Sequence, residues 1–207
     1  MDAKEESRRH FDRWSPRYEE DRVSRWLAEA QREALAGLEL RAADRLLDVG
    51  CGTGAAVREA APTLERAVGV DLSAGMIDRA RELGAGLENT EFVRGDSESL
   101  PFGDGEFTAV LCTTSFHHYP QPDRALREMA RVLAPGGRLA IADARADHPA
   151  VRVLDAILRR VQRSHVGFRR SAELTSLIEA AGLDDVAART MWSGGYMIVI
   201  ARKPGSR

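Results

Sequence analysis

The chain has 207 residues, of which 43% are hydrophobic and 30% charged, a composition that fits one ordinary globular domain. The formal net charge of −2 gives no reason to expect nucleic acid or an anionic membrane as a partner. No apolar run approaches the ~20 residues of a membrane helix, and the charged N-terminus lacks the apolar stretch of a secretory signal. Cys51 and Cys112 are too few for a disulfide framework or a zinc site, so we expect a cytoplasmic protein without a bound metal.

Apolar residues between positions 18 and 40 recur at helical spacing and predict one amphipathic helix. Beyond residue 43, short apolar runs alternate with amphipathic stretches. The predicted strands are 45–50, 66–71, 91–96, 107–114 and 138–143, and the predicted helices lie near 54–61, 74–83 and 122–133. The last helix has Pro122 near its first turn and should stop at the Pro-Gly-Gly of 135–137. Such alternation predicts right-handed βαβ units and a mainly parallel sheet.

The C-terminal part has a different pattern. A basic amphipathic segment at 150–165 and a helix at 171–181 precede two strands, 184–192 and 196–204. These strands meet across Ser193-Gly194-Gly195, which predicts an antiparallel hairpin. The expected fold is therefore α/β: a doubly wound, Rossmann-like sheet of seven strands, mainly parallel, with the hairpin at one edge.

The first three predicted strands each end with a carboxylate, at Asp48, Asp71 and Asp96. Open α/β sheets bind ligands at this edge. The loop that begins at Gly50 and continues through Gly52 satisfies the loose dinucleotide pattern G-x-G-x-x-G/A, and Asp71 follows 21 residues after Gly50, as expected for an acid that binds ribose. A nicotinamide-dinucleotide dehydrogenase is therefore one interpretation of this loop.

Charge separates this interpretation from another. A dinucleotide would bring a doubly negative pyrophosphate close to Asp48, and like charges several ångströms apart repel by on the order of a few kcal/mol. S-adenosylmethionine carries a sulfonium and an ammonium and no phosphate, so a carboxylate at Asp48 favours it. Asp71 could then hold both ribose hydroxyls, and Asp96 could accept from the adenine amino group.

The stretch from Leu46 to Leu139 resembles the class I S-adenosylmethionine-dependent methyltransferases, most closely the small-molecule subgroup related to ubiquinone and menaquinone biosynthesis enzymes. The motifs that carry the resemblance are LLDVGCGTG (46–54), VGVDLSAGMIDRAR (68–81), FVRGDSESLPFGDGEF (92–107) and SFHHYPQPDRALREMARVLAPGG (115–137). It implies a site for S-adenosylmethionine, with S-adenosylhomocysteine as the product.

The resemblance also implies roles for single residues. Gly50 and Gly52 would pack against the cofactor. Independently of the resemblance, we expect Cys51 between them to be a small packed residue rather than a nucleophile, because nothing near it in the sequence would form its thiolate. The remaining implied contacts are Asp71 to the ribose, Leu72 and Met76 around the adenine with Ser97 near its edge, the Thr113 backbone to the methionine end, and Tyr18 to the methionine carboxylate.

Two further residues form a candidate catalytic pair. His117 and Asp143 follow the fourth and fifth strands, which should be neighbours, and sugar O-methyltransferases have a histidine and an aspartate at similar places. Such a pair could deprotonate a hydroxyl acceptor. The alternative is that His117 packs and Asp143 caps the following loop.

The chain is expected to be one domain, 1–207. Its parts would be an N-terminal helical covering segment (1–42), the cofactor-binding core (43–145), a small substrate cap (146–170), and a C-terminal helix and hairpin (171–207). The helix at 21–38 and the basic stretch at 150–165 are expected to form a lid over the carboxyl edge of the sheet.

Because the predicted cap is short, we expect a small-molecule methyl acceptor and no nucleic acid or membrane partner. A non-catalytic S-adenosylmethionine-binding protein is the alternative from another class, and a homodimer is left open. Residues 144–170 contain seven arginines against two aspartates. This surplus indicates either a solvated helix face or a surface for an acidic substrate or partner.

Overall fold

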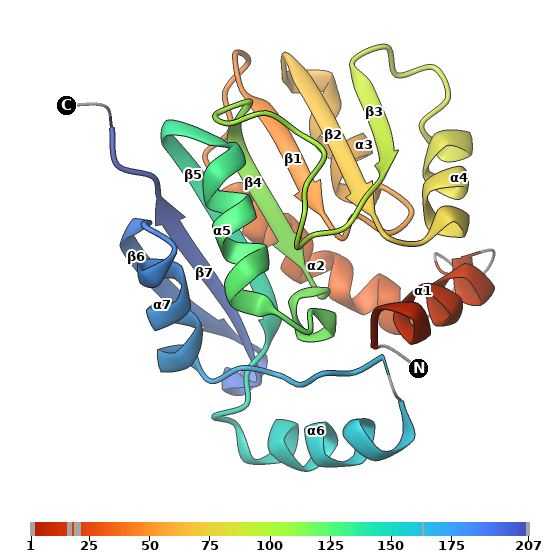
Figure 1. Cartoon of the computed structure of the whole chain (residues 1–207), viewed down its shortest axis with the longest axis vertical. Helices are drawn as coiled ribbons and strands as arrows, with labels where there is room; N and C mark the ends of the chain where they lie inside the picture. The colour runs from red at the N-terminus through yellow and green to blue at the C-terminus, as the bar shows by residue number, and fades with distance from the viewer. Residues whose placement is uncertain (1–2, 16–17, 19–21, 163, 206–207) are drawn as a thin grey trace.

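The computed structural model describes residues 3–15, 18, 22–162 and 164–205. Within these residues the chain forms a seven-stranded sheet in the order β3-β2-β1-β4-β5-β7-β6 (Figure 1). The strands are β1 Arg45–Val49, β2 Arg66–Asp71, β3 Thr90–Arg94, β4 Phe107–Thr113, β5 Leu133–Ala144, β6 Asp184–Met191 and β7 Tyr196–Arg202. Strands β1 to β5 pair in parallel, and β7 runs antiparallel to both β5 and β6. The predicted fold class is confirmed, including the antiparallel hairpin at the edge.

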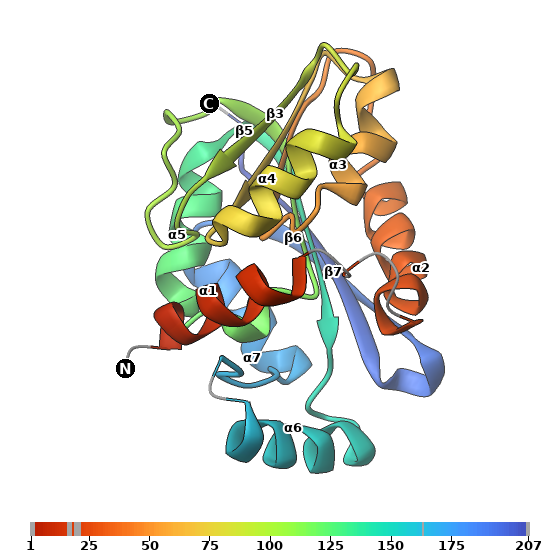
Figure 2. The same cartoon turned by 90° about the vertical axis from the view of Figure 1, so that its right-hand side faces the viewer.

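Helices cover both faces of this sheet (Figures 1 and 2). One face carries α2 (Arg22–Gly37), α3 (Ala55–Ala60) and α4 (Ala74–Leu83), and the other carries α5 (Pro122–Val132) and α7 (Ser171–Ala180). The two neighbouring leucines Leu46 and Leu47 show why both faces are covered. Successive side chains on a strand point to opposite faces, and these two belong to different hydrophobic clusters, each fully buried.

The helix α2 is not a lid, and the expectation for residues 21–38 was wrong on this point. Ala30, Ala34 and Leu38 are at most 1% exposed and pack with residues of β4, β5 and β7 on one face of the sheet. Two alanines spaced four residues apart leave a flat stripe, so the helix can lie close against the strands.

The cover over the carboxyl edge is instead the first part of the expected N-terminal covering segment, 1–42, although the sequence pattern did not predict a separate helix there. The helix α1 (Ala3–Trp14) lies beyond the carboxyl ends of the strands, next to α4 and the short 3₁₀ turn η3 (Phe116–His118) (Figures 1 and 2).

The helix α5 ends at Val132, close to the predicted end, but β5 begins immediately afterwards at Leu133. The Pro-Gly-Gly of 135–137 therefore lies within the strand, where the register against β4 shifts between Phe107 and Ala109. After this irregularity Thr113 pairs with Ala142, so Asp143 stands one residue further on, at the carboxyl edge.

The helix α6 (Pro149–Val161) lies across the end of the molecule, beyond the carboxyl ends of the strands (Figures 1 and 2). The residues that follow it return to η3, where the backbone N–H groups of Val166 and Gly167 donate to the carbonyl of His117. In the part of the chain that the structure describes, no helix is both long and apolar enough to cross a membrane.

Candidate functional site

A pocket opens at the carboxyl edge of the sheet, between the loops after β1 to β4 and the covering helix α1. Most of the predicted cofactor residues line it, namely Tyr18, Gly50, Gly52, Asp71, Leu72, Met76, Asp96, Ser97 and Thr113. Asp48 and Cys51 lie behind the lining, as do His117 and Asp143.

The loop after β1 presents backbone to the pocket. Gly50 has φ +77°, and a Cβ at this position would lie 2.3 Å from the Ser115 hydroxyl oxygen. Gly52 has φ +53°, and a Cβ there would stand 3.8 Å from the ring of Tyr18 across the pocket. Only glycine fits this turn without strain, and the missing side chains leave a cradle in which a ligand can approach the main chain closely.

Asp71 is held rigidly at the end of β2. Its Oδ2 accepts from the Gly52 backbone N–H and its Oδ1 from the Ser73 backbone N–H, each at 2.9 Å. Burial nevertheless raises the pKa of Asp71 above its usual value. A carboxylate oxygen has two lone pairs, so each oxygen keeps one acceptor site for a further donor such as a ribose hydroxyl.

Asp48 differs from the expectation in its charge. Its side chain is 2% exposed, and Oδ1 has no hydrogen-bond partner among the described residues. Burial, together with the negative charge of Asp71, raises the pKa of Asp48 to about 8. At this pKa Asp48 is mainly protonated at neutral pH in the ligand-free protein, so it does not supply the fixed negative charge that the charge argument assigned to it. The acidic side chains that face the pocket itself are Asp71 and Asp96.

The buried Asp48 makes stability depend on pH. Its folded-state pKa lies above the unfolded value, so the folded state holds more protons and stability falls as pH rises. Between pH 5 and 7 we expect the wild-type chain to lose about 1 kcal/mol of unfolding free energy per pH unit relative to Asp48→Asn. Urea unfolding of both proteins across this range measures the difference. Parallel pH profiles would show that Asp48 ionises normally in the folded protein.

The helix α1 supplies pocket residues that sequence reasoning missed. Lys4, Ser7 and Phe11 line the pocket from one face of α1. Their spacing of three and four residues was a helical signal, although the charged composition of the segment obscured it. The ammonium of Lys4 lies 2.7 Å from Asp96 Oδ2 and 2.5 Å from Glu98 Oε2. Asp96, expected to receive the adenine amino group, thus already has a cationic partner.

The other end of α1 is also fixed. Asp12 Oδ1 accepts from the Ser73 hydroxyl at 2.6 Å and from the Gly75 backbone N–H at 3.1 Å. Both donors belong to the N-terminus of α4, where helix geometry favours a negative charge. Polar contacts near both ends therefore hold α1 over the pocket.

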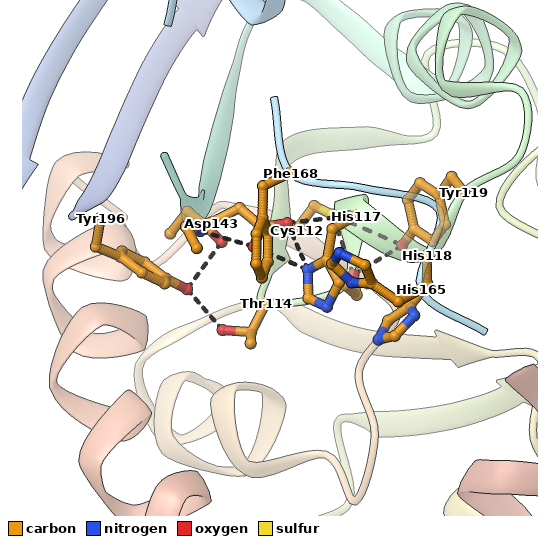
Figure 3. A network of polar contacts seen from close by, with 12 residues as sticks. Cys112, Thr114, His117, His118, Tyr119, Asp143, His165, Phe168 and Tyr196 are labelled. Carbon is orange, nitrogen blue, oxygen red and sulfur yellow. Dashed lines mark hydrogen bonds and ion pairs between the residues drawn. The ribbon is translucent and has the colours of Figure 1, made fainter. Parts of the chain in front are cut away.

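The structure brings His117 and Asp143 together, as the strand order predicted. His117 Nδ1 lies 2.9 Å from both carboxylate oxygens, and the His117 backbone N–H donates to Oδ2 at 3.0 Å. Figure 3 shows the pair beside the rings of His118, His165 and Phe168. Neither His117 nor Asp143 is among the residues that line the pocket.

His118 is the histidine that lines the pocket. Its Nδ1 lies 2.7 Å from the Ser164 carbonyl oxygen, and because a carbonyl only accepts, Nδ1 carries the hydrogen. Burial, with a smaller contribution from His117, lowers the pKa of His118 well below 6.5. The ring is therefore neutral at pH 7, and its Nε2 is an unprotonated acceptor. The ring of Phe11 packs edge-on against it at 5.1 Å.

Comparison with known proteins agrees with this geometry. A family model described as a methyltransferase domain matches residues 47–141. The demethylmenaquinone methyltransferase of Clavibacter sepedonicus is 30% identical over 186 residues, which cover 80% of this chain and 76% of that protein. The chain belongs to the class I S-adenosylmethionine-dependent methyltransferases, in the group related to the quinone methyltransferases.

Other relatives extend the picture of this methyltransferase. The uncharacterized methyltransferase YcgJ of Bacillus subtilis is 34% identical over 148 residues, covering 69% of this chain and 58% of that protein. A chain with the same fold occurs in the solved complex of the Haloferax volcanii Trm112 methyltransferase activator with a methyltransferase. The two chains superpose with a TM-score of 0.83 at 22% identity, and the match covers 94% of this chain and 97% of that one. The chain spans about half the length, 43% to 58%, of several curated relatives it matches.

Proposed function

We propose that this methyltransferase binds S-adenosylmethionine in the pocket and transfers its methyl group to a small-molecule acceptor. The observation that carries the proposal is the arrangement of Asp71 beside the Gly50–Gly52 loop. A buried carboxylate with acceptor capacity on both oxygens faces a bare backbone cradle, and no basic residue of the loop is available to hold a pyrophosphate. This arrangement suits a ribose and a cationic methyl donor better than a dinucleotide.

The proposed contacts follow the lining of the pocket. Asp71 holds the ribose, Leu72 and Met76 pack on the adenine with Ser97 near its edge, and the methionine end lies along Gly52, Thr113 and Tyr18. The bound cofactor supplies a methyl group on a positively charged sulfur, a good leaving group. The chain's own contribution is to align donor and acceptor and to exclude water under α1.

On the acceptor side we assign His118 rather than His117. An unprotonated Nε2 in the pocket wall accepts a hydrogen bond from an acceptor hydroxyl and takes its proton as the methyl group is transferred. His117 and Asp143 act behind it: the His117 ring, 4.1 Å from that of His118, is fixed by the carboxylate and supports the wall.

The direct test is incubation with S-adenosylmethionine carrying a radiolabelled methyl group and with pools of small metabolites. Transfer of label to one pool supports the function and leads to the acceptor by fractionation. Tight binding of S-adenosylhomocysteine without transfer to any pool would favour the non-catalytic binding protein. Tighter binding of NAD than of S-adenosylhomocysteine in calorimetry would overturn the cofactor assignment.

The contacts of α1 predict that it controls cofactor exchange. Replacing Asp12 with alanine removes the acceptor for Ser73 and Gly75 at the N-terminus of α4. The loss of about 1 kcal/mol expected for such contacts should release S-adenosylhomocysteine roughly fivefold faster. Stopped-flow displacement measures the rate.

The matched control for Asp12 is Asp123→Ala. Asp12 pairs with Arg8, four residues before it, and Asp123 likewise pairs with Arg127, four residues after it, but Asp123 lies on α5 and is not part of the pocket lining. Equal release rates for both variants and the wild type would show that α1 does not gate the site.

The cytoplasmic location and the homodimer remain predictions.

A further inference from the structure

The large hydrophobic side chains that are exposed among the described residues all lie on α6. Val153, Leu154, Ile157 and Val161 are 62%, 45%, 51% and 73% exposed. Their spacing places them on one side of the helix, which we call the α6 face. No residue of α6 is buried. Contiguous exposed apolar surface of this kind marks an interaction site.

The exposed charges of α6 have one sign: Arg160 flanks the α6 face, and Arg152 and Arg159 lie on the opposite side of the helix. Arg152, Arg159 and Arg160 are exposed, and the single acid of the helix, Asp155, is turned toward the protein. Its Oδ1 accepts from His165 Nε2 at 2.7 Å and from the Phe168 backbone N–H at 2.8 Å.

Arg159 pairs with Asp155, but Arg152 and Arg160 make no ion pair with any described carboxylate. The helix therefore combines an apolar face with uncompensated positive charge.

The position of α6 leaves this surface open to an extended partner. Figures 1 and 2, taken at right angles, both show α6 as the outermost element at its end of the molecule, with its axis across that end. The segment after α6 reaches the pocket wall, because the Ser164 carbonyl accepts from His118 Nδ1. A surface that holds α6 would therefore lie on the acceptor side of the site.

We propose that α6 lies on an anionic lipid surface. The α6 face would enter the boundary between headgroups and acyl chains, and the arginines would face lipid phosphates, as in interfacial amphipathic helices. This proposal replaces the expectation that the protein has no membrane partner. It goes beyond the proposed function, since it concerns where an acceptor is met and not how methyl transfer occurs.

A second copy of the chain fits this surface less well. A helix of 13 residues is about 20 Å long and ~10 Å wide, so it offers on the order of 200 Å² of contact. Stable protein interfaces bury about 800 Å² per partner. A symmetric contact through α6 would also bring the arginines of both copies close together, whereas anionic lipid neutralises them.

The test is co-sedimentation of the full chain with vesicles of phosphatidylcholine alone and with about 30% phosphatidylglycerol. We expect at least fivefold stronger partitioning to the anionic vesicles. The double variant Val153→Gln/Ile157→Gln should reduce this partitioning at least fivefold, and Arg152→Gln/Arg160→Gln should remove the preference for phosphatidylglycerol. The matched control Arg79→Gln/Arg127→Gln, at exposed arginines on α4 and α5, should partition like the wild type.

Three outcomes would overturn the proposal. These are wild-type partitioning to anionic vesicles no stronger than to phosphatidylcholine, α6 variants that partition like the control, and a lipid-free dimer that Val153→Gln/Ile157→Gln converts to a monomer. Thermal unfolding of each variant verifies folding, and the arginine variant leaves the apolar face intact. The cofactor's dissociation constant, measured without lipid, is independent of all three, so failure here is distinguishable from failure of the proposed function.

Discussion

Replacing Asp71 with alanine should weaken S-adenosylhomocysteine binding by roughly 10- to 150-fold, or about 1.5–3 kcal/mol, the range for hydrogen bonds to a charged group. The carboxylate would lose its contacts to the ribose hydroxyls, and the backbone N–H groups of Gly52 and Ser73 would lose their acceptor. The cradle would thus lose both a ligand contact and part of its support. Isothermal titration calorimetry measures the dissociation constant.

Two further variants sharpen this experiment. Asp71→Asn keeps the shape of the side chain, but its two neighbours, the backbone N–H groups of Gly52 and Ser73, are both donors. The amide NH₂ would face one of these donors in either orientation, so binding of S-adenosylhomocysteine should remain weak. Asp78→Ala is the control: it removes an exposed acid on α4 that is not part of the pocket lining. This variant should bind S-adenosylhomocysteine like the wild type. An unchanged dissociation constant in a folded Asp71→Ala protein would place the ribose elsewhere.

Replacing His118 with alanine should lower the turnover rate by ~10²-fold or more once a hydroxyl acceptor is in hand, the usual contribution of a general base. The affinity for S-adenosylhomocysteine should change less than threefold, because the proposed role concerns the acceptor. His148→Ala removes a histidine outside the pocket lining and is the matched control. A loss under about threefold for His118→Ala would leave alignment as the whole mechanism.

The pH profile tests the same residue independently. Burial keeps the pKa of His118 well below 6.5, so its Nε2 is unprotonated throughout the range from pH 6.5 to 8. Turnover of the wild type should therefore stay level across this range. A steep fall as the pH drops from 8 to 6.5 would indicate a base with a higher pKa and would count against His118.

Much of the fold was predictable because burial leaves a periodic trace in the sequence. The two leucines that precede Asp48 belong to a strand covered on both sides, and such a strand reads as a continuous apolar run. The glycines after it were predictable because Gly50 and Gly52 adopt positive φ, which other residues rarely do. The position of Asp71 at the end of the next strand followed from the same alternation.

The choice between the two histidines was decided only by the tertiary structure. His117 and His118 are adjacent, and their pattern says nothing about which ring enters the pocket. The end of β5 and the segment after α6 decide this: the carboxylate of Asp143 holds the His117 ring, and the Ser164 carbonyl orients the His118 ring. A one-residue difference at a strand exit changes the side chain that faces a site.

The protonation state of Asp48 and the contacts that hold α1 over the pocket could also be read only from the folded structure. A sequence shows Asp48 as a carboxylate, but only its burial beside Asp71 shows that it is mainly neutral at pH 7. Seven of the twelve residues of α1 are charged, and polar contacts such as those of Asp12 and Lys4 hold it over the pocket together with the packing of Phe11 against His118. The sequence alone therefore determined the strands, the glycine loop and the position of Asp71 at a strand end, which depend on local periodicity and backbone freedom. Tertiary packing decided which ionisable groups face the ligand and in which protonation state, because those depend on neighbours far apart in the chain.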